Sequence, residues 1–261
     1  MPFFRAARKQ PCRPIQMLMD AFLNLVYPDN CIICAAPVSC QKDCGVCDPC
    51  WTKACALRIQ PPFCPSCGIP FQALDSSDFH LCGRCILETP PYSGARSFGF
   101  YAAELSSLIQ QLKFRGRRNL DGLLAQLLLW RFCDSWTWND FDLIVPVPLH
   151  LRRYHERGYN QAALLARRLS CLTGIPHRES LLSRVRPTPS QVGLTDLERF
   201  QNLRRAFHCT DPRGAVGQRI LLIDDVMTTG ATVSSAGETL LDSGASRVSV
   251  LTVARAVPGV E

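Results

Sequence analysis

Residues 219–233 read "RILLIDDVMTTGATV", an apolar run that leads into two acids and then into a hydroxyl-rich turn. The apolar residues 220–223 show no polar alternation, which is typical of a strand buried on both faces of a parallel sheet. Asp224 and Asp225 are expected to end this strand, where the chain leaves the sheet for solvent. Ligands of such α/β sheets bind beyond the carboxyl ends of the strands, so the two acids mark a candidate site.

The turn at 228–232 contains three threonines around Gly230 and opens a predicted helix. Free backbone N–H groups and the dipole at a helix start favour a phosphate, and glycine lets the backbone approach it closely. Two carboxylates beside a phosphate would repel it unless they contact something else, such as ribose hydroxyls or a hydrated magnesium ion. The stretch therefore predicts a ribose 5-phosphate site. In the alternative, Asp225 and the threonines only cap the helix, but a cap does not require two acids.

The same kind of pattern extends along the chain from residue 91. Further buried strands are predicted at 141–148 ("FDLIVPVP") and 246–255 ("SRVSVLTVAR"). Apolar residues at helical spacing predict helices between and before the strands, at 105–114, 119–132, 159–172 and 232–244. Strands that alternate with helices indicate a parallel sheet covered by helices on both faces.

Fifteen cysteines are present, and most of them lie in the first third of the chain. Eight form CxxC pairs, a spacing that lets one turn aim two thiolates at a tetrahedral ion. The simplest assignment is two consecutive ribbons with one structural zinc each. The ligands are Cys31, Cys34, Cys47 and Cys50 in the first ribbon, and Cys64, Cys67, Cys82 and Cys85 in the second. A cross-braced pairing, and Cys44 as an alternative partner of Cys47, remain open; Cys12, Cys40, Cys44 and Cys55 are expected to be free thiols.

Composition narrows the class of protein. The formal charge of +7 suits a polyanionic partner or a phosphorylated ligand, with a solvated basic surface as the alternative. The absence of GxxxxGK[ST] argues against a P-loop ATPase. An amphipathic helix is predicted at 14–28, and apolar runs fall short of the ~20 residues that a membrane span needs. We expect a cytoplasmic protein without a membrane span.

The motifs together resemble a known family. "ILLIDDVMTTGAT" (220–232) is similar to the phosphoribosyl pyrophosphate (PRPP) motif of type I phosphoribosyltransferases. With "QLKFRGRRNL", "VPVPLHLRRYHERGYNQAALLA" and the CxxC pairs, the chain resembles the ComF family, known from competence for DNA uptake, over about residues 14–255. The resemblance implies a helix at 14–28, a double zinc ribbon at 29–90 and a type I phosphoribosyltransferase fold at 91–261.

The resemblance also implies site residues. Asp224 and Asp225 would contact the ribose hydroxyls and serve as the catalytic pair of a transfer reaction, with Mg²⁺ accompanying PRPP. The implied PRPP-binding residues are Asp224, Asp225, Val226, Met227, Thr228, Thr229, Gly230, Ala231 and Thr232.

Basic residues elsewhere are expected to hold the pyrophosphate. The loop after the strand at 141–148 would receive it, since guanidinium groups suit bidentate phosphate contacts; its residues are Arg152, Arg153, Arg157 and Gly158. The segment 183–207 resembles the mobile loop that closes over PRPP, with Arg184, Arg186, Gln191 and Arg199. The alternative for the loop after the strand at 141–148 is a solvated basic turn, and the alternative for the segment 183–207 is a simple connector. Lys113 and Arg115 are candidates for the same anion-binding surface.

Three functions are compatible with these features. The first is an enzyme that transfers a phosphoribosyl group from magnesium-bound PRPP to an acceptor. The second is a non-catalytic factor that handles single-stranded DNA, together with proteins of the competence machinery, because zinc ribbons and arginines beside aromatic residues suit nucleic acid. The third is a PRPP-responsive regulator. Turnover of labelled PRPP would distinguish the first from the other two.

Overall fold

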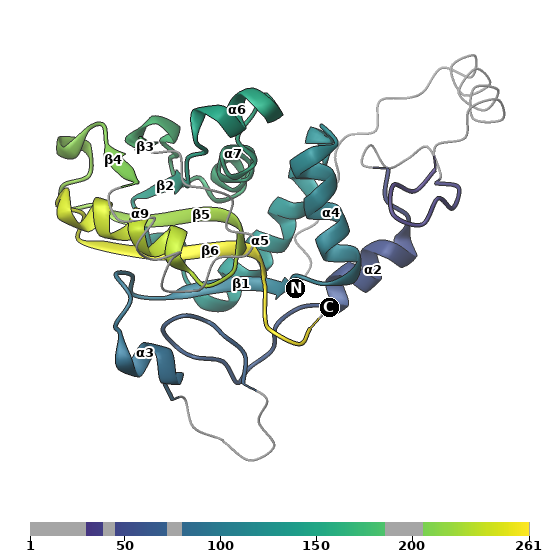
Figure 1. Ribbon diagram of the computed structural model, residues 1–261, viewed down its shortest axis with the longest axis horizontal. Helices are drawn as coiled ribbons and strands as arrows, with labels where there is room; N and C mark the ends of the chain where they lie inside the picture. Colours follow the sequence, from purple (N-terminus) through teal and green to yellow (C-terminus); the bar gives the residue numbers. More distant parts are fainter. Residues whose placement is uncertain (1–29, 39–44, 72–79, 186–205, 261) are drawn as a thin grey trace. The chain divides into compact units, whose positions relative to one another are not determined.

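The computed structural model describes residues 30–38, 45–71, 80–185 and 206–260 (Figure 1). The chain forms two compact units, residues 1–51 and 52–261, and helix α2 (Asp48–Ala56) spans the division between them. The helix predicted at 14–28 lies outside the described residues, as do Cys12, Cys40 and Cys44. Of the described helices, none is long and apolar enough to cross a bilayer.

Each unit contains one Cys-rich turn of the same design. In the first unit, Asn30 pairs with Pro37 in an antiparallel bridge around the turn that carries Cys31 and Cys34. In the second unit, Phe63 pairs with Pro70 in the same way, and the short helix α3 (Gly83–Leu87) follows. The two turns are thus tandem copies of one local structure.

The second unit is built on a parallel sheet with the strand order β1-β6-β5-β2 (Figure 1). Its strands are β1 (Ala95–Phe100), β2 (Leu143–Pro146), β5 (Arg219–Met227) and β6 (Arg247–Arg255). A second, antiparallel pair joins β3 (Leu182–Arg184) to β4 (Phe207–Cys209). The strand β5, which carries the two acids, lies inside the parallel sheet between β6 and β2.

Helices cover both faces of this sheet. The helices are α4 (Ala103–Phe114), α5 (Asp121–Ser135), α6 (Leu151–Arg157), α7 (Gln161–Thr173) and α9 (Ala231–Asp242). Helices α5 and α7 contact each other and the sheet, and α9 contacts β4, β5 and β6. The predicted fold class is confirmed: an α/β body with a parallel sheet and flanking helices accompanies a Cys-rich module.

Alternate residues of β5 point to opposite faces, and both faces are buried. Ile220 and Leu222 pack in one cluster with Ala236 and Leu240 of α9. Leu221 and Ile223 are also fully buried, on the face away from α9 because successive strand residues alternate. Burial on both faces explains why this run shows no polar alternation, and each fully buried side chain contributes about 1.5–3 kcal/mol.

The structure differs from the sequence prediction at the end of β5. The strand was expected to end at the two acids, but it continues to Met227, because β6 pairs with it as far as Arg255. On the other side, β2 stops at Pro146 opposite Ile223. Asp224 and Asp225 therefore lie within a strand whose neighbour on one side has already ended.

The segment 149–161, predicted to be a loop, contains the helix α6. The His150 side chain accepts a hydrogen bond from the Arg152 N–H at 3.2 Å and caps the first turn. An ion pair of 3.0 Å joins Arg152 to Glu156 one turn later. Gly158, at a φ of +74°, ends the helix in the left-handed region. The N-cap hydrogen bond, the ion pair and the glycine at the end stabilise α6, which is too short to show clear periodicity in the sequence.

The predicted mobile loop at 183–207 is described only at its two ends. Arg184 lies at the end of β3, in a paired strand rather than in a loop. Arg186, Gln191 and Arg199 lie outside the described residues.

Candidate functional site

A cavity of about 290 Å³ opens at the carboxyl ends of β2 and β5. Seven of the nine residues predicted for PRPP line it: Asp224, Asp225, Val226, Met227, Thr228, Gly230 and Thr232. Thr229 and Ala231 do not. The early end of β2 forms one wall, because the Val147 N–H donates to the Ile223 carbonyl at 2.9 Å and the chain then turns away into α6. The cavity lies at the sheet edge that the sequence predicted.

Asp225 is held by two side chains from distant parts of the chain. Only 4% of the residue is exposed. Lys113 Nζ lies 2.9 Å from Asp225 Oδ1, and Gln161 Nε2 donates to Oδ2 at 2.8 Å. A buried carboxylate needs such partners, because its desolvation is costly. Lys113 was predicted only as part of an anion-binding surface, and here it neutralises an acid.

Gln161 is a cavity residue that the sequence analysis did not identify. It is the first residue of α7, which the side chain of Asn160 caps through the Ala162 N–H at 3.0 Å. Because its Nε2 donates to Asp225, its Oε1 is an acceptor, and this buried atom has no hydrogen-bond partner among the described residues. A hydroxyl of a ligand in the cavity would satisfy it. The only signal in the sequence is the "YNQ" at the start of the predicted helix.

Asp224 differs from its neighbour because it faces the cavity without a direct ion pair in the described structure. Burial, and then the negative charge of Asp225, raise its pKa to about 7, although the nearby charge of Lys113 opposes the shift. The Asp225 N–H donates to Asp224 Oδ1 at 2.8 Å, which also favours the ionised form. This carboxyl therefore changes protonation near neutral pH, a property that is frequent at functional sites.

Three arginines line the cavity together with the acids: Arg153 and Arg157 from α6 and Arg184 from β3. Burial lowers the pKa of Arg157 and of Arg184. The Arg157 guanidinium lies 4.8 Å from the ring centroid of Phe114, and that of Arg184 lies 5.5 Å from that of Phe207. Each of the two guanidinium groups thus packs against an aromatic ring, which favours a fixed position for these cavity arginines.

The other two predicted pyrophosphate residues lie elsewhere. The side chain of Arg152 is exposed and pairs with Glu156 instead of lining the cavity. Gly158 ends α6, where Arg118 Nη2 donates to its carbonyl at 3.3 Å. The structure therefore brings together two of the three predicted arginines of this segment, and it adds Arg184.

The turn between β5 and α9 lines the cavity with Thr228, Gly230 and Thr232. Gly230 is the N-cap residue of α9 and has a φ of +86°. A Cβ at this position would lie 2.8 Å from Met227 Cε, so the left-handed conformation and the packing both favour glycine. Glycine has no side chain that could cap the helix, and the start of a helix favours an anion.

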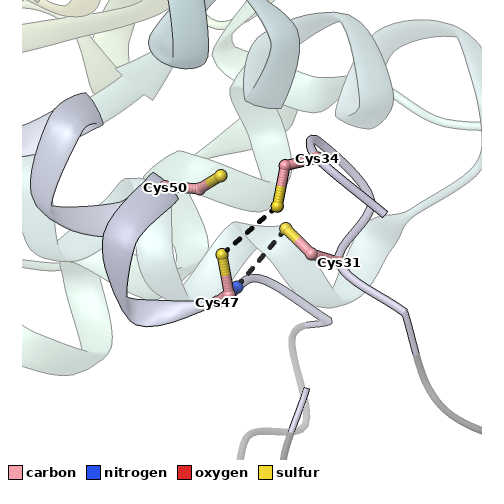
Figure 2. Close-up of side chains that lie close together, drawn as sticks. All are labelled: Cys31, Cys34, Cys47 and Cys50. Atoms are coloured by element: carbon pink, nitrogen blue, oxygen red, sulfur yellow. Dashed lines mark hydrogen bonds between the residues drawn. The ribbon is translucent and has the colours of Figure 1, made fainter. Parts of the chain in front are cut away.

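The predicted cysteines form two separate clusters. Within each set of four, Cys31, Cys34, Cys47 and Cys50 or Cys64, Cys67, Cys82 and Cys85, the sulfurs lie within 4.8 Å of one another. Figure 2 shows the four side chains of the first set converging. The Cys34 and Cys47 sulfurs are 3.6 Å apart, as are those of Cys67 and Cys82. Tetrahedral zinc with bonds of about 2.3 Å would separate its sulfurs by about 3.8 Å. The donor sets fit zinc, and the pairing is tandem, not cross-braced.

Backbone N–H groups support the sulfurs in both clusters. The Cys47 N–H donates to Cys31 Sγ at 3.4 Å, and the Cys82 N–H donates to Cys64 Sγ at the same distance. Burial raises the pKa of these two acceptor thiols, but N–H donors outweigh it and bring the pKa to about 6 for Cys31 and about 7 for Cys64. Each cluster thus contains one thiol that is readily ionised for metal binding.

Comparisons with known proteins agree with these features. A family model described as a double zinc ribbon domain matches residues 22–92. The DNA utilization protein YhgH of Salmonella typhimurium is 35% identical over 88% of this chain and 99% of its own length. Competence protein F of Haemophilus influenzae is 34% identical over 87% of this chain and 97% of its own length. The chain belongs to the ComF family. A more distant ComF relative, competence protein ComFC of Bacillus subtilis, is 30% identical over 82% of this chain and 86% of its own length.

Solved structures give a weaker likeness to this ComF-family chain. Glutamine PRPP amidotransferase from B. subtilis matches 52% of this chain and 26% of its own, with 21% identity and a TM-score of 0.33. A hypoxanthine phosphoribosyltransferase of Trypanosoma cruzi matches 54% and 65%, with 13% identity and a TM-score of 0.32. Likeness at this level supports no statement about ligand or reaction. The fold class follows from the sheet, helices and Cys-rich module themselves.

Proposed function

We propose that this protein binds PRPP, as its magnesium complex, in the cavity at the end of β5. The observation that supports the proposal most strongly is that one cavity contains two acids, the N-terminal turn of α9 and three arginines. These groups match the three parts of the ligand: ribose hydroxyls, 5-phosphate and pyrophosphate. The contacts of Asp224 and Asp225 with neighbouring side chains indicate that the two acids have different roles.

Asp224 is the acid that accepts hydrogen bonds from the ribose hydroxyls, because Lys113 and Gln161 already contact both oxygens of Asp225. The free Oε1 of Gln161 accepts a further hydroxyl. The turn at 228–232 holds the 5-phosphate, and Arg153, Arg157 and Arg184 hold the pyrophosphate. If pyrophosphate departs, the ribose becomes positively charged, and the two carboxylates stabilise that charge.

The relatives suggest where PRPP binding would be used. Their names refer to DNA utilization and to competence. We propose that this protein acts in the uptake or use of DNA, with single-stranded DNA and proteins of the competence machinery as partners, and that PRPP is either its substrate for phosphoribosyl transfer or the signal that controls it. Turnover of labelled PRPP separates these two uses.

The proposed function predicts a pH dependence of binding. The ionised fraction of Asp224 falls as the pH drops through about 7, because its pKa is raised to about 7. PRPP should therefore bind up to about tenfold more weakly near pH ~6 than near pH ~8. Calorimetry with magnesium and PRPP at both pH values measures this, and Asp224→Asn is the control that retains only the titration of the ligand. The same pH dependence in both proteins would contradict the assigned role of Asp224.

In the absence of ligand, the raised pKa of Asp224 also affects the stability of the fold. This contribution to stability is larger at low pH than at high pH, whereas PRPP affinity is expected to be larger at high pH. The pKa of Asp224 is higher in the folded protein than its ordinary value of 3.8. Its contribution to stability is therefore complete below pH ~3.8 and is lost as the pH rises through ~7. Ligand binding at neutral pH has to overcome the repulsion between the two acids, which magnesium or hydroxyl donors relieve.

A second candidate function, binding of single-stranded DNA, is favoured by a basic and aromatic surface beside the cavity. Phe114 is 66% exposed and carries Arg157 on its ring. Arg115 and Arg117 are exposed next to it, and Tyr154 on α6 is also exposed. Exposed rings among arginines are the features on which bases stack and phosphates bind. Both candidate functions can coexist, since this surface adjoins the cavity and does not fill it.

This candidate predicts a loss of affinity when Phe114 is removed. Stacking of a base on an aromatic ring contributes about 1–3 kcal/mol, so Phe114→Ala should weaken oligothymidylate binding by about fivefold or more. Affinity should also fall steeply as salt rises, because counterions are released from the strand. Fluorescence anisotropy with a labelled oligonucleotide measures both effects. Leu172→Ala, which truncates an exposed apolar residue of α7, is the matched control. Equal loss in both variants, or no salt dependence, would contradict the assignment.

A further inference from the structure

The second Cys cluster is connected to the turn of the candidate phosphate site. Arg84 lies within the second CxxC of this cluster, between Cys82 and Cys85. Its Nη1 donates to the carbonyl of Thr229 at 2.5 Å. Thr229 does not line the cavity. Its hydroxyl accepts a hydrogen bond from the Ala231 N–H at 3.4 Å, so Thr229 stabilises the conformation of the turn. One residue of the ribbon thus contacts the backbone of the turn directly.

A second arginine makes the same connection from inside the protein. Arg255, the last residue of β6, is only 4% exposed. Its Nη1 donates to the carbonyl of Cys67 at 2.7 Å and lies 3.0 Å from the sulfur of Met227. Cys67 belongs to the cluster, and Met227 is the last residue of β5 before the turn. The guanidinium therefore bridges the ribbon and the base of the turn.

A negative charge nearby favours the buried charge of Arg255, and its guanidinium contacts the backbone of Cys67, a residue of the cluster. Among the described residues the structure gives Arg255 no carboxylate partner. Four thiolates carry more negative charge than one divalent ion, so a zinc-bound cluster is a net anion. Zinc binding at the second cluster thus compensates a buried cation that touches Met227.

Close packing makes this connection stiff. A Cβ on Gly68 would lie 2.3 Å from the Ala95 carbonyl, so the ribbon lies directly against β1. The Ala95 N–H donates to the Ser66 carbonyl at 2.7 Å. Tyr92 is buried, and its hydroxyl lies 3.6 Å from the position that a Cβ on Gly230 would occupy. A ribbon anchored to the sheet in this way can hold the turn in one conformation.

We propose that the second ribbon is part of the candidate phosphate site, with Arg84 and Arg255 as positioning residues for the turn at 228–232. Zinc at the second cluster then organises the backbone N–H groups that receive the phosphate. The consequence for PRPP affinity rests on the proposed function, but the conformational effect on the turn does not. Two measurements distinguish the conformational effect on the turn from the effect on PRPP affinity.

The first readout is hydrogen exchange of the amides at 228–232 in the full-length, zinc-loaded protein without ligand. In Arg84→Ala these amides should exchange about threefold to tenfold faster, which corresponds to the loss of one hydrogen bond of about 1 kcal/mol. Arg167→Ala removes another exposed positive charge, from α7, and should leave this exchange as in the wild type. Zinc content should remain at two ions in both variants.

The second readout is calorimetry with magnesium and PRPP on the same proteins. Arg84→Ala should bind about threefold to tenfold more weakly than Arg167→Ala, because the turn has to be ordered by the ligand. Cys85→Ser, which removes a zinc ligand from the second cluster, should loosen the turn more than Cys50→Ser, its counterpart in the first cluster.

Unchanged exchange at 228–232 in both Arg84→Ala and Cys85→Ser would overturn the proposal. If Cys85→Ser unfolds the second unit, the exchange of Arg84→Ala decides alone. Absence of PRPP binding by the wild type, combined with faster exchange in Arg84→Ala, would retain the proposal and reject PRPP as the ligand.

Discussion

Removal of zinc is expected to unfold the ribbons and to destabilise the second unit. Each site should contain one ion, and structural zinc contributes on the order of 10 kcal/mol to the folding of such small modules. The buried residues around the second cluster are mainly its own cysteines, with Ile69 and Phe71 only partly buried against them. The apolar core of the ribbon is therefore too small to fold it without metal.

The two sites should respond differently to chelation. The second cluster lies in the unit that contains the sheet, and the backbone of this region bonds to β1, with Phe100 N–H donating to the Leu57 carbonyl at 2.9 Å and Ala95 to Ser66. Loss of zinc there should lower the melting temperature of the sheet-containing unit. Loss of zinc from the first cluster should affect residues 30–51.

Elemental analysis and thermal unfolding by circular dichroism measure these effects. The wild type should contain two zinc ions and Cys64→Ser one. Cys55→Ser is the control, since Cys55 is a half-buried free thiol outside both clusters. A protein that contains no zinc, or one whose zinc content Cys64→Ser leaves unchanged, would reject the two-site assignment.

Replacing the two acids is expected to abolish most of the affinity for PRPP. Asp224→Asn should weaken binding by at least about tenfold, since charge-assisted hydrogen bonds contribute ~1.5–3 kcal/mol each and ~1.4 kcal/mol corresponds to that factor. Its fold should survive, because Asp224 faces the cavity and has no direct ion pair among the described residues. The double variant with Asp225→Asn should lose at least as much affinity. Calorimetry with magnesium and PRPP measures the difference.

Asp225→Asn should also reduce stability. It leaves the ammonium group of Lys113, whose side chain is only 17% exposed, without its carboxylate. We expect a loss of about 1–3 kcal/mol in the free energy of unfolding, less than for a completely buried pair because an amide oxygen can still accept from Lys113. Combining Asp225→Asn with Lys113→Met removes both charges, and this pair should recover part of the loss. Urea unfolding of the variants measures these terms.

Two outcomes would contradict these assignments. Equal PRPP affinity in the wild type and in Asp224→Asn would mean that the acid does not contact the ligand. Additive stability losses for Asp225→Asn and Lys113→Met would mean that the ion pair contributes nothing. Absence of any PRPP binding by the intact protein would reduce the turn at 228–232 to a helix cap.

Local sequence patterns were sufficient to predict the framework of the protein. The apolar run before Asp224, the glycine in the turn and the CxxC spacing all act over a few residues, because strand burial, a left-handed turn and a two-thiolate turn depend on near neighbours. The helices α4, α5, α7 and α9 follow from apolar spacing in the same way. The short helix α6 escaped prediction because its seven residues depend on its caps.

The tertiary structure alone decided which distant groups meet. Lys113 and Gln161 are 112 and 64 residues away from Asp225 along the chain, yet they contact its two oxygens. The contacts of Arg84 with Thr229 and of Arg255 with Cys67 are of the same kind. Such contacts depend on how the sheet places strand ends and helix starts beside one another. A buried charge then pairs with a group of suitable charge that the fold has placed next to it. The tandem pairing of the CxxC turns was the simplest assignment from the sequence, and the structure decided it against the cross-braced alternative. The residue types of the site could be read from neighbours in the sequence, but their partners depend on the packing of the whole unit.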